Sequence, residues 1–233
     1  MNILAIDTCL GALSVGIGRA HADGMFCVTE HYEQRATGHA ERLVPMIEAE
    51  MVRAGLAFRD LARIAVTLGP GTFTGVRTGI AVARALRLAT GVEIVGASSL
   101  AVMARRIFEI VDGDESNQPV MIAVDARRGR LYTQLFGSGA LDPLSAPSEM
   151  TAEAAADIAL RHGARLAGSG ARLAAEAAGS SGELSIACDD LQPHAGDLVW
   201  LAIPLEPLDD VTPLYIRPPD AKPQADKHLA RAS

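Results

Sequence analysis

The chain has 233 residues, of which 49% are hydrophobic and only 4% aromatic, and its formal net charge is −7. This length predicts one large domain or two small ones, with a core of small and aliphatic side chains. The negative charge argues against a protein that binds nucleic acid tightly on its own. No apolar run reaches the length of a membrane span and no signal peptide is visible, so we expect a cytoplasmic protein. Three distant cysteines without a Cys-x-x-Cys pair favour reduced thiols over zinc ligands or disulfides.

The start of the chain predicts a three-stranded meander followed by a helix. Strands are expected at 2–8, 13–18 and 25–31. The first strand ends in an acid, Asp7. The helix is expected over 37–54, with His39 at its start and an apolar stripe at helical spacing that consists of Leu43, Ile47 and Met51.

A glycine-rich loop between a strand and a helix is the most distinctive local motif. Strand 64–68 leads into Gly69-Pro70-Gly71-Thr72-Phe73-Thr74-Gly75, and a helix continues to residue 89. A helix start offers free N–H groups and a positive dipole end, so the loop is either an anion site or a plain tight turn. It is not a Walker A loop, because no Gly-Lys-Ser/Thr follows. We predict at most a weak nucleotide or anion contact, at Asp7, Gly69, Gly71, Thr72 and Gly75.

The helix after this loop has a face of small residues. Gly75, Gly79 and Ala83 recur every four positions, although each glycine inside a helix costs about 1 kcal/mol relative to alanine. Such a face indicates that another backbone comes very close. That backbone belongs either to this chain's own sheet or to a second chain.

The second part of the chain repeats the first. Val120–Asp125 parallels Asn2–Asp7 at an offset of about 118 residues, and in both copies a glycine and a second apolar strand follow the acid. Gly168-Ser169-Gly170 echoes the glycine loop. We therefore predict an α/β protein with two similar halves, at 1–111 and 112–217, and a disordered tail at 218–233 that is rich in proline and charge.

This duplicated pattern resembles the actin-like ATPase (ASKHA) fold, with two ribonuclease-H-like halves that have mixed sheets flanked by helices. Five segments are, in order and spacing, similar to the TsaB (YeaZ-type) family of the bacterial tRNA threonylcarbamoyladenosine system. They are 3–8, 69–79, 98–100, 125–128 and 213–217. The resemblance implies a non-catalytic scaffold subunit, a paralogue of TsaD, which binds and activates that transferase for modification of adenosine 37 in tRNA.

The resemblance also implies partners. The helices at 37–54 and 73–89 would bind a TsaD-type catalytic subunit, or a second copy when the chain is alone, and a TsaE-type ATPase would join them. No membrane takes part. The implied interface residues are His39, Leu43, Ile47, Met51, Phe73, Gly75, Val76, Arg77, Gly79, Ile80, Ala83 and Arg84. The chain would meet tRNA only within the complex, and the candidate contacts are Arg127, Arg128 and Arg130, which are otherwise an ordinary solvated surface.

We expect a pseudo-active site rather than an enzyme. TsaD-like proteins carry a His-x-x-x-His metal pair, and the corresponding positions here look like Ser99 and Met103, which are poor ligands for a divalent metal. We therefore predict no catalytic residue, no metal and no cofactor bound by the chain alone, with ATP or ADP held at the interface of the complex. The alternatives are an independent ATPase of the same fold and a glycoprotease-like peptidase that uses Ser98, Ser99, His39 and Asp7.

Overall fold

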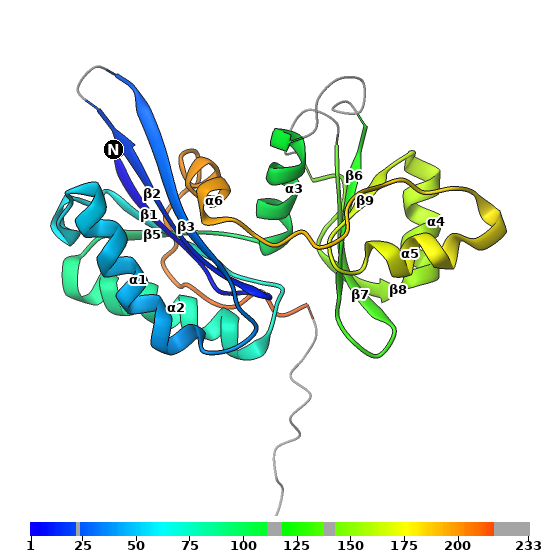
Figure 1. Ribbon diagram of the computed structural model, residues 1–233, viewed down its shortest axis with the longest axis horizontal. Helices are drawn as coiled ribbons and strands as arrows, with labels where there is room; N and C mark the ends of the chain where they lie inside the picture. The colour runs from blue at the N-terminus through cyan, green and yellow to red at the C-terminus, as the bar shows by residue number, and fades with distance from the viewer. Residues whose placement is uncertain (22–23, 111–117, 138–142, 217–233) are drawn as a thin grey trace, which may run out of the picture.

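The computed structural model describes residues 1–21, 24–110, 118–137 and 143–216, and it contains two α/β halves (Figure 1). Each half is built on a five-stranded mixed sheet. The tail expected at 218–233 lies outside the described residues. The expected fold class is confirmed by these two sheets and their flanking helices.

The sheet of the first half begins with an antiparallel meander. Its strands are β1 (Asn2–Asp7), β2 (Ala12–Ala20), β3 (Phe26–Gln34), β4 (Arg63–Thr67) and β5 (Glu93–Ala97), in the spatial order β3-β2-β1-β4-β5. β4 pairs with β1 in parallel, and β5 pairs with β4 in parallel. Helices α1 (His39–Ala54) and α2 (Phe73–Thr90) pack side by side against one face of this sheet (Figure 1). A short 3-10 helix (Phe58–Asp60) precedes β4.

The second half has the same strand order, so the internal duplication is confirmed. Its strands are β6 (Val120–Asp125), β7 (Arg130–Phe136), β8 (Ser148–Thr151), β9 (Arg165–Ala167) and β10 (Ile186–Cys188), in the order β10-β9-β6-β7-β8. Helices α4 (Ala152–His162) and α5 (Ala171–Ala178) occupy the places of α1 and α2, and a 3-10 turn (Gly179–Ser181) follows α5. The sequence did not predict β8 and β10, which have only four and three residues.

The last helix of each half packs largely on the other half. Helix α3 (Ser99–Ile110) follows β5, but Leu100, Met103 and Ile107 lie in a core with the strands of the second sheet. Helix α6 (Ala195–Ala202) follows β10, but Leu198 lies in a core with Ile3 of β1. Residues from the segment 112–217 therefore pack on both sheets. The predicted boundary between the two halves at residue 111 rests on the sequence repeat and stays a prediction.

After α6, the chain returns along the first half. The Leu208 N–H donates to the Ile94 carbonyl at 2.8 Å, and the Leu214 N–H donates to the Leu68 carbonyl at 2.7 Å. Val211 is fully buried in the core of the first half. All three cysteines are free thiols. Within the described ranges, no helix is long and apolar enough to cross a lipid bilayer.

Candidate functional site

The glycine loop packs closely on the turn that follows β1. Thr72 is the N-cap of α2, and its Oγ1 accepts the Gly75 N–H at 3.1 Å. The Thr72 N–H donates to the Cys9 carbonyl at 2.7 Å. A Cβ at Gly71 would overlap that same carbonyl oxygen. The loop therefore needs glycine because the backbone of this chain lies against it.

The small-residue face of α2 is also covered by this chain. A Cβ at Gly75 would overlap the Thr8 carbonyl oxygen, and a Cβ at Gly79 would lie 2.7 Å from the Thr8 hydroxyl. The Thr8 hydroxyl donates to the Gly75 carbonyl at 2.6 Å. Of the two alternatives left open by the sequence, the neighbour is the chain's own sheet. The assignment of Gly75, Gly79 and Ala83 to a partner interface was therefore wrong.

The apolar stripe of α1 is also covered by this chain. Periodicity shows which side chains share a face, and here that face packs on the first sheet. The expected interface residues that are buried in this way are His39, Leu43, Ile47, Met51, Val76 and Ile80. The outer faces instead present Val52, which is 80% exposed, and Leu88, which is 91% exposed, together with Val44. Val52 and Leu88 were not predicted as interface residues, because hydrophobic periodicity marks the buried stripe of a helix and not its opposite side.

Three expected interface residues are exposed. The Arg77 guanidinium lies 3.6 Å from the Phe73 ring centroid, and its Nε donates to the Tyr215 hydroxyl at 2.8 Å. Phe73 and Tyr215 are 49% and 42% exposed. Arg84 pairs with Asp210 at 2.8 Å. Asp210 and Tyr215, in the segment after α6, thus contact exposed side chains of α2.

Asp7, the acid expected at the nucleotide loop, is sealed inside the protein. Its Oδ1 accepts the Thr67 hydroxyl at 2.5 Å and the Cys9 N–H at 3.4 Å. Its Oδ2 has no hydrogen-bond partner within the described part of the chain. Burial raises the pKa of Asp7 to about 7, because the charged carboxylate is removed from water. Asp7 has no exposed surface through which it could touch a nucleotide.

The residues that a peptidase would need are separated and serve the fold. The Ser99 hydroxyl is fully buried and donates to the Pro70 carbonyl at 2.6 Å. The Ser98 hydroxyl accepts the Ala101 N–H at 3.0 Å at the start of α3. The His39 Nε2 lies 2.8 Å from the Arg35 carbonyl oxygen. Among described residues, no hydrogen bond joins these serines to His39 or Asp7, and no cluster of three His, Cys, Asp or Glu could hold a metal.

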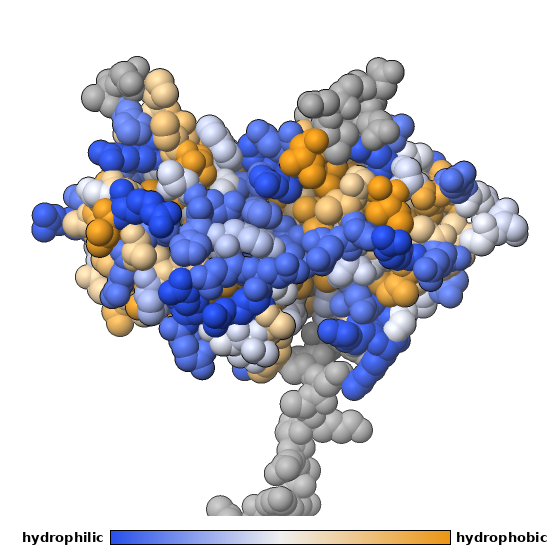
Figure 2. Space-filling model, viewed as in Figure 1, coloured by the Kyte–Doolittle hydropathy of each residue, from blue (hydrophilic) through white to orange (hydrophobic). Residues whose placement is uncertain are grey.

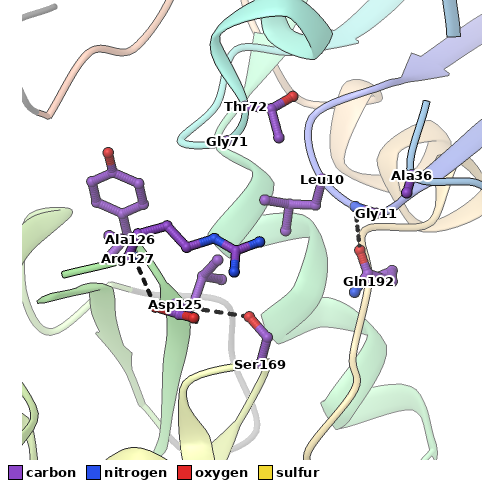
Figure 3. A pocket seen from close by; sticks show the side chains of 12 residues that line it. Leu10, Gly11, Ala36, Gly71, Thr72, Asp125, Ala126, Arg127, Ser169 and Gln192 are labelled. Carbon is purple, nitrogen blue, oxygen red and sulfur yellow. Dashed lines mark hydrogen bonds between the residues drawn. The ribbon is translucent and has the colours of Figure 1, made fainter. Parts of the chain in front are cut away.

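A cavity of about 500 Å³ lies between the two halves (Figure 3). Its walls come from the turn after β1, the glycine loop and the turn between β6 and β7. Arg127 and Arg128 in that last turn have φ angles of 67° and 56°, which is uncommon for residues with a Cβ. Arg130, the third predicted tRNA contact, pairs with Glu149 at 3.2 Å. Arg127 lines the cavity, while the Arg130 side chain is directed to the edge strand β8.

Comparison with known proteins gives one family. The model described as "TsaD: tRNA N6-adenosine threonylcarbamoyltransferase" matches residues 32–175. The Escherichia coli (strain K12) "tRNA threonylcarbamoyladenosine biosynthesis protein TsaB" is 36% identical over 132 residues, which cover 57% of this chain and 53% of that protein. An uncharacterized protein of Mycobacterium tuberculosis is 31% identical over 226 residues, which cover 96% of this chain and 95% of that protein. The match thus spans about half the length of the TsaB relative and nearly all of the mycobacterial one.

Solved structures agree with this comparison. YeaZ from Pseudomonas aeruginosa superposes with a TM-score of 0.71 at 27% identity, over 92% of this chain and 99% of that chain. A second structure from the same species, described as an uncharacterized protein with similarity to peptidase YEAZ, has a TM-score of 0.74 at 27% identity. It covers 93% of this chain and 99% of that chain.

Proposed function

The chain belongs to the TsaD family, in which it is a TsaB/YeaZ-type protein, and from this premise we propose that it is a non-catalytic subunit of the threonylcarbamoyladenosine system of tRNA. In this proposal it binds a TsaD-type transferase and activates it for modification of adenosine 37. It makes no bond itself. The alignment with the TsaB relative covers 57% of this chain and 53% of that protein. The role of the rest of this chain is therefore part of the same proposal.

The observation that supports this role is the sealed position of Asp7. An acid that assists phosphate chemistry must reach the substrate or a bound metal. Asp7 is fully buried below the turn after β1, and Thr67 and Cys9 hold its Oδ1. The glycine loop closes over this turn, since the Thr72 N–H donates to the Cys9 carbonyl. Such an arrangement favours a structural acid over a catalytic one.

For the partner site, we propose the outer faces of α1 and α2. Val44, Val52 and Leu88 are exposed there, and the rim carries Phe73 and Arg77. A contiguous apolar patch on a protein surface marks an interaction site, and these side chains lie on two helices that pack side by side. In Figure 2, hydrophobic residues gather mainly over the second half, and the face over the first half is more hydrophilic. Leu173 on α5 is an exposed apolar residue of the second half and serves as a comparison site. A second copy of the chain would use the same helices when the transferase is absent.

We also propose a second protein partner, a nucleotide and tRNA as components of the complex. A TsaE-type ATPase joins the pair, and ATP or ADP binds at the interface of the complex rather than to this chain alone. The complex brings tRNA within reach of Arg127 and Arg128, both of which are exposed. We propose the cytoplasm as the place of action, where the tRNA substrate is found.

The test is formation of threonylcarbamoyladenosine on tRNA by the reconstituted enzymes of the system, with this chain present or omitted. We expect product only when the chain is present, and no ATP hydrolysis or tRNA modification by the chain alone. The Asp7→Asn variant should support product formation as well as the wild-type chain does. Equal product without the chain would contradict the proposed role, and ATP turnover that disappears in Asp7→Asn would favour the independent ATPase instead.

A further inference from the structure

The first sheet has a long end strand with an open edge. β3 (Phe26–Gln34) is the last strand on its side of the sheet and pairs with β2 alone among the described strands (Figure 1). The opposite edge is covered, because the segment after α6 returns along β5 and the Leu208 N–H donates to the Ile94 carbonyl at 2.8 Å. The end strands of the second sheet, β8 and β10, have only four and three residues. With nine residues, β3 is therefore the longest end strand of the described molecule.

The backbone of β3 presents hydrogen-bonding groups on its open side. Residue pairs in an antiparallel ladder alternate between bonded and non-bonded pairs. The Arg35 N–H donates to the Gly11 carbonyl at 2.9 Å, just beyond the last pair of the β2–β3 ladder, so the odd-numbered residues of β3 bond to β2. The even-numbered residues direct their N–H and C=O groups outward. Within the described ranges, these outward groups of Phe26, Val28 and Glu30 make no hydrogen bond with another backbone.

β3 lacks the features that usually protect a long edge strand from pairing with another chain. Such strands are commonly interrupted by proline or a bulge, or they carry free lysines. β3 has no proline and no lysine, and it pairs with β2 in one register over all nine residues. The charge of Glu33 is balanced by Arg42 at 2.6 Å. An open edge of this kind hydrogen-bonds with an extended backbone, so its chemistry specifies an extended peptide as the ligand.

The side chains beside the open edge indicate which peptide fits. Phe26 and Val28 pack toward α6, where the Phe26 ring centroid lies 5.2 Å from that of Trp200, which is 40% exposed. Glu30 lies on the same face of β3, and its half-buried carboxylate accepts the Ser14 hydroxyl at 2.5 Å. Directly opposite residues of neighbouring strands interact favourably as aromatic pairs, apolar pairs or opposite charges. A peptide with an aromatic residue near Trp200 and a basic residue opposite Glu30 therefore fits this edge.

We propose that the open edge of β3 binds an extended segment of a partner protein, which adds a sixth strand to the first sheet. The segment runs antiparallel to β3, since this direction gives the more stable pairing. It places an aromatic residue opposite Phe26, an aliphatic residue opposite Val28 and a basic residue opposite Glu30. This edge is distinct from the outer faces of α1 and α2, so the inference goes beyond the proposed partner site.

The experiment measures binding of the capped peptide acetyl-Thr-Lys-Thr-Val-Thr-Phe-Thr-amide to the full chain. Trp200, the one tryptophan, reports binding through its fluorescence, and calorimetric titration gives the affinity. N-methylation of the lysine and the valine removes two N–H groups that face β3, and we expect it to weaken binding at least about tenfold. N-methylation of the second and third threonines is the matched control, because those N–H groups point away from β3. It should change the affinity less than about threefold.

A variant of the chain tests the same edge from the other side. Val28→Pro removes one outward N–H at an edge strand, where proline is tolerated, and it should weaken peptide binding about fivefold or more. Ala152→Pro, at the first position of α4, is its control and should bind the peptide as the wild-type chain does. Urea unfolding shows whether each variant is folded.

Two results would overturn the proposal. One is the absence of saturable binding, or an equal effect of the two N-methylated peptides. The other is a dimer of the chain that the peptide dissociates and that Val28→Pro cannot form, because the edge would then belong to a second copy. If Val28→Pro fails to fold, the N-methylated peptides still decide, since they use the wild-type chain. Because the chain is tested alone, failure here leaves the proposed subunit role untouched.

Discussion

Asp7 shows how one residue type can suggest chemistry in a sequence and yet serve the fold. An apolar strand that ends in an acid is the pattern of a phosphate or metal site, and the structure does place Asp7 at the end of β1. The carboxyl group is nevertheless buried, and one of its oxygens has no partner in the described residues. Leaving a charged oxygen unsatisfied is costly, so the protein holds the neutral acid more readily than the anion.

This burial predicts a pH-dependent stability. The pKa of Asp7 is raised from 3.8 to about 7 in the folded protein, so the unfolded chain loses its proton first as pH rises. The contribution of Asp7 to the free energy of unfolding is therefore greatest below about pH 4 and is lost progressively up to about pH 7, by as much as about 4 kcal/mol. Urea unfolding at several pH values should show that Asp7→Asn removes this loss. Burial also raises the pKa of Asp197, to about 6, but both proteins share that contribution.

The control for this prediction is Asp157→Asn, which changes an exposed acid on α4. It should leave the pH dependence of unfolding as it is in the wild type. If the free energy of unfolding falls by the same amount between acid and neutral pH in the wild type and in Asp7→Asn, the raised pKa of Asp7 is contradicted.

A second prediction concerns Gly75. Helix propensity alone says that Gly75→Ala stabilises α2 by about 1 kcal/mol. We expect the opposite, a loss of about 2–3 kcal/mol, because the new methyl group would overlap the Thr8 carbonyl oxygen. Urea denaturation measures the difference. Ala81→Gly, on the exposed side of the same helix, is the comparison and should cost only about 1 kcal/mol. A stabilised Gly75→Ala protein would mean that α2 does not lie this close to the end of β1.

Among the elements, helices α1 and α2 carry the proposed partner site on their outer faces. We expect Val52→Glu and Leu88→Glu to weaken binding of the TsaD-type subunit at least about tenfold, because each places a charge in an apolar contact. Both positions are so exposed that the free energy of unfolding should change by less than about 0.5 kcal/mol. Calorimetric titration with the partner and urea unfolding of each variant measure the two quantities.

The matched control is Leu173→Glu on α5, in the second half. It makes the same kind of change at an exposed apolar residue away from α1 and α2, and it should leave partner binding intact. Wild-type affinity in Val52→Glu and Leu88→Glu, or a loss shared by all three variants, would move the partner site elsewhere.

The elements also show what sequence reasoning can and cannot reach. The β1–β3 meander and the repeated strand at Val120–Asp125 are local patterns, and each was predicted. The stripe on α1 was correctly identified as one face, but periodicity does not say what covers a face. It was therefore assigned to a partner when it packs on the first sheet.

The missed features of the candidate site are long-range or conformational. The left-handed backbone at Arg127 and Arg128 could not be predicted, because neither residue type favours it. The seal over Asp7 depends on contact between residues some sixty positions apart along the chain, as between Asp7 and Thr67. β8 and β10 are too short to show a periodic pattern.

At the scale of the whole molecule, α3 and α6 bind the two halves together. Each helix fills part of a core on the other half, so neither sheet keeps a complete core if the other unfolds. We expect a single unfolding transition. The fluorescence of Trp200, the one tryptophan, reports on α6, and amide exchange of β6 and β7 reports on the second sheet. Coincident transitions are expected if α3 and α6 each pack on the other half, whereas two separate midpoints would show that the halves unfold independently.

The packing of α3 and α6 on the opposite halves also sets the order in which the two cores are completed during translation. The second sheet needs α3, which has already been translated when β6 emerges. The first sheet needs α6 and Val211, which are translated near the end of the chain. The half that begins first is thus finished last. A nascent chain paused before residue 195 carries an uncovered apolar face of β1 and β2 throughout the pause, and exposed surface of this kind favours aggregation until α6 covers it.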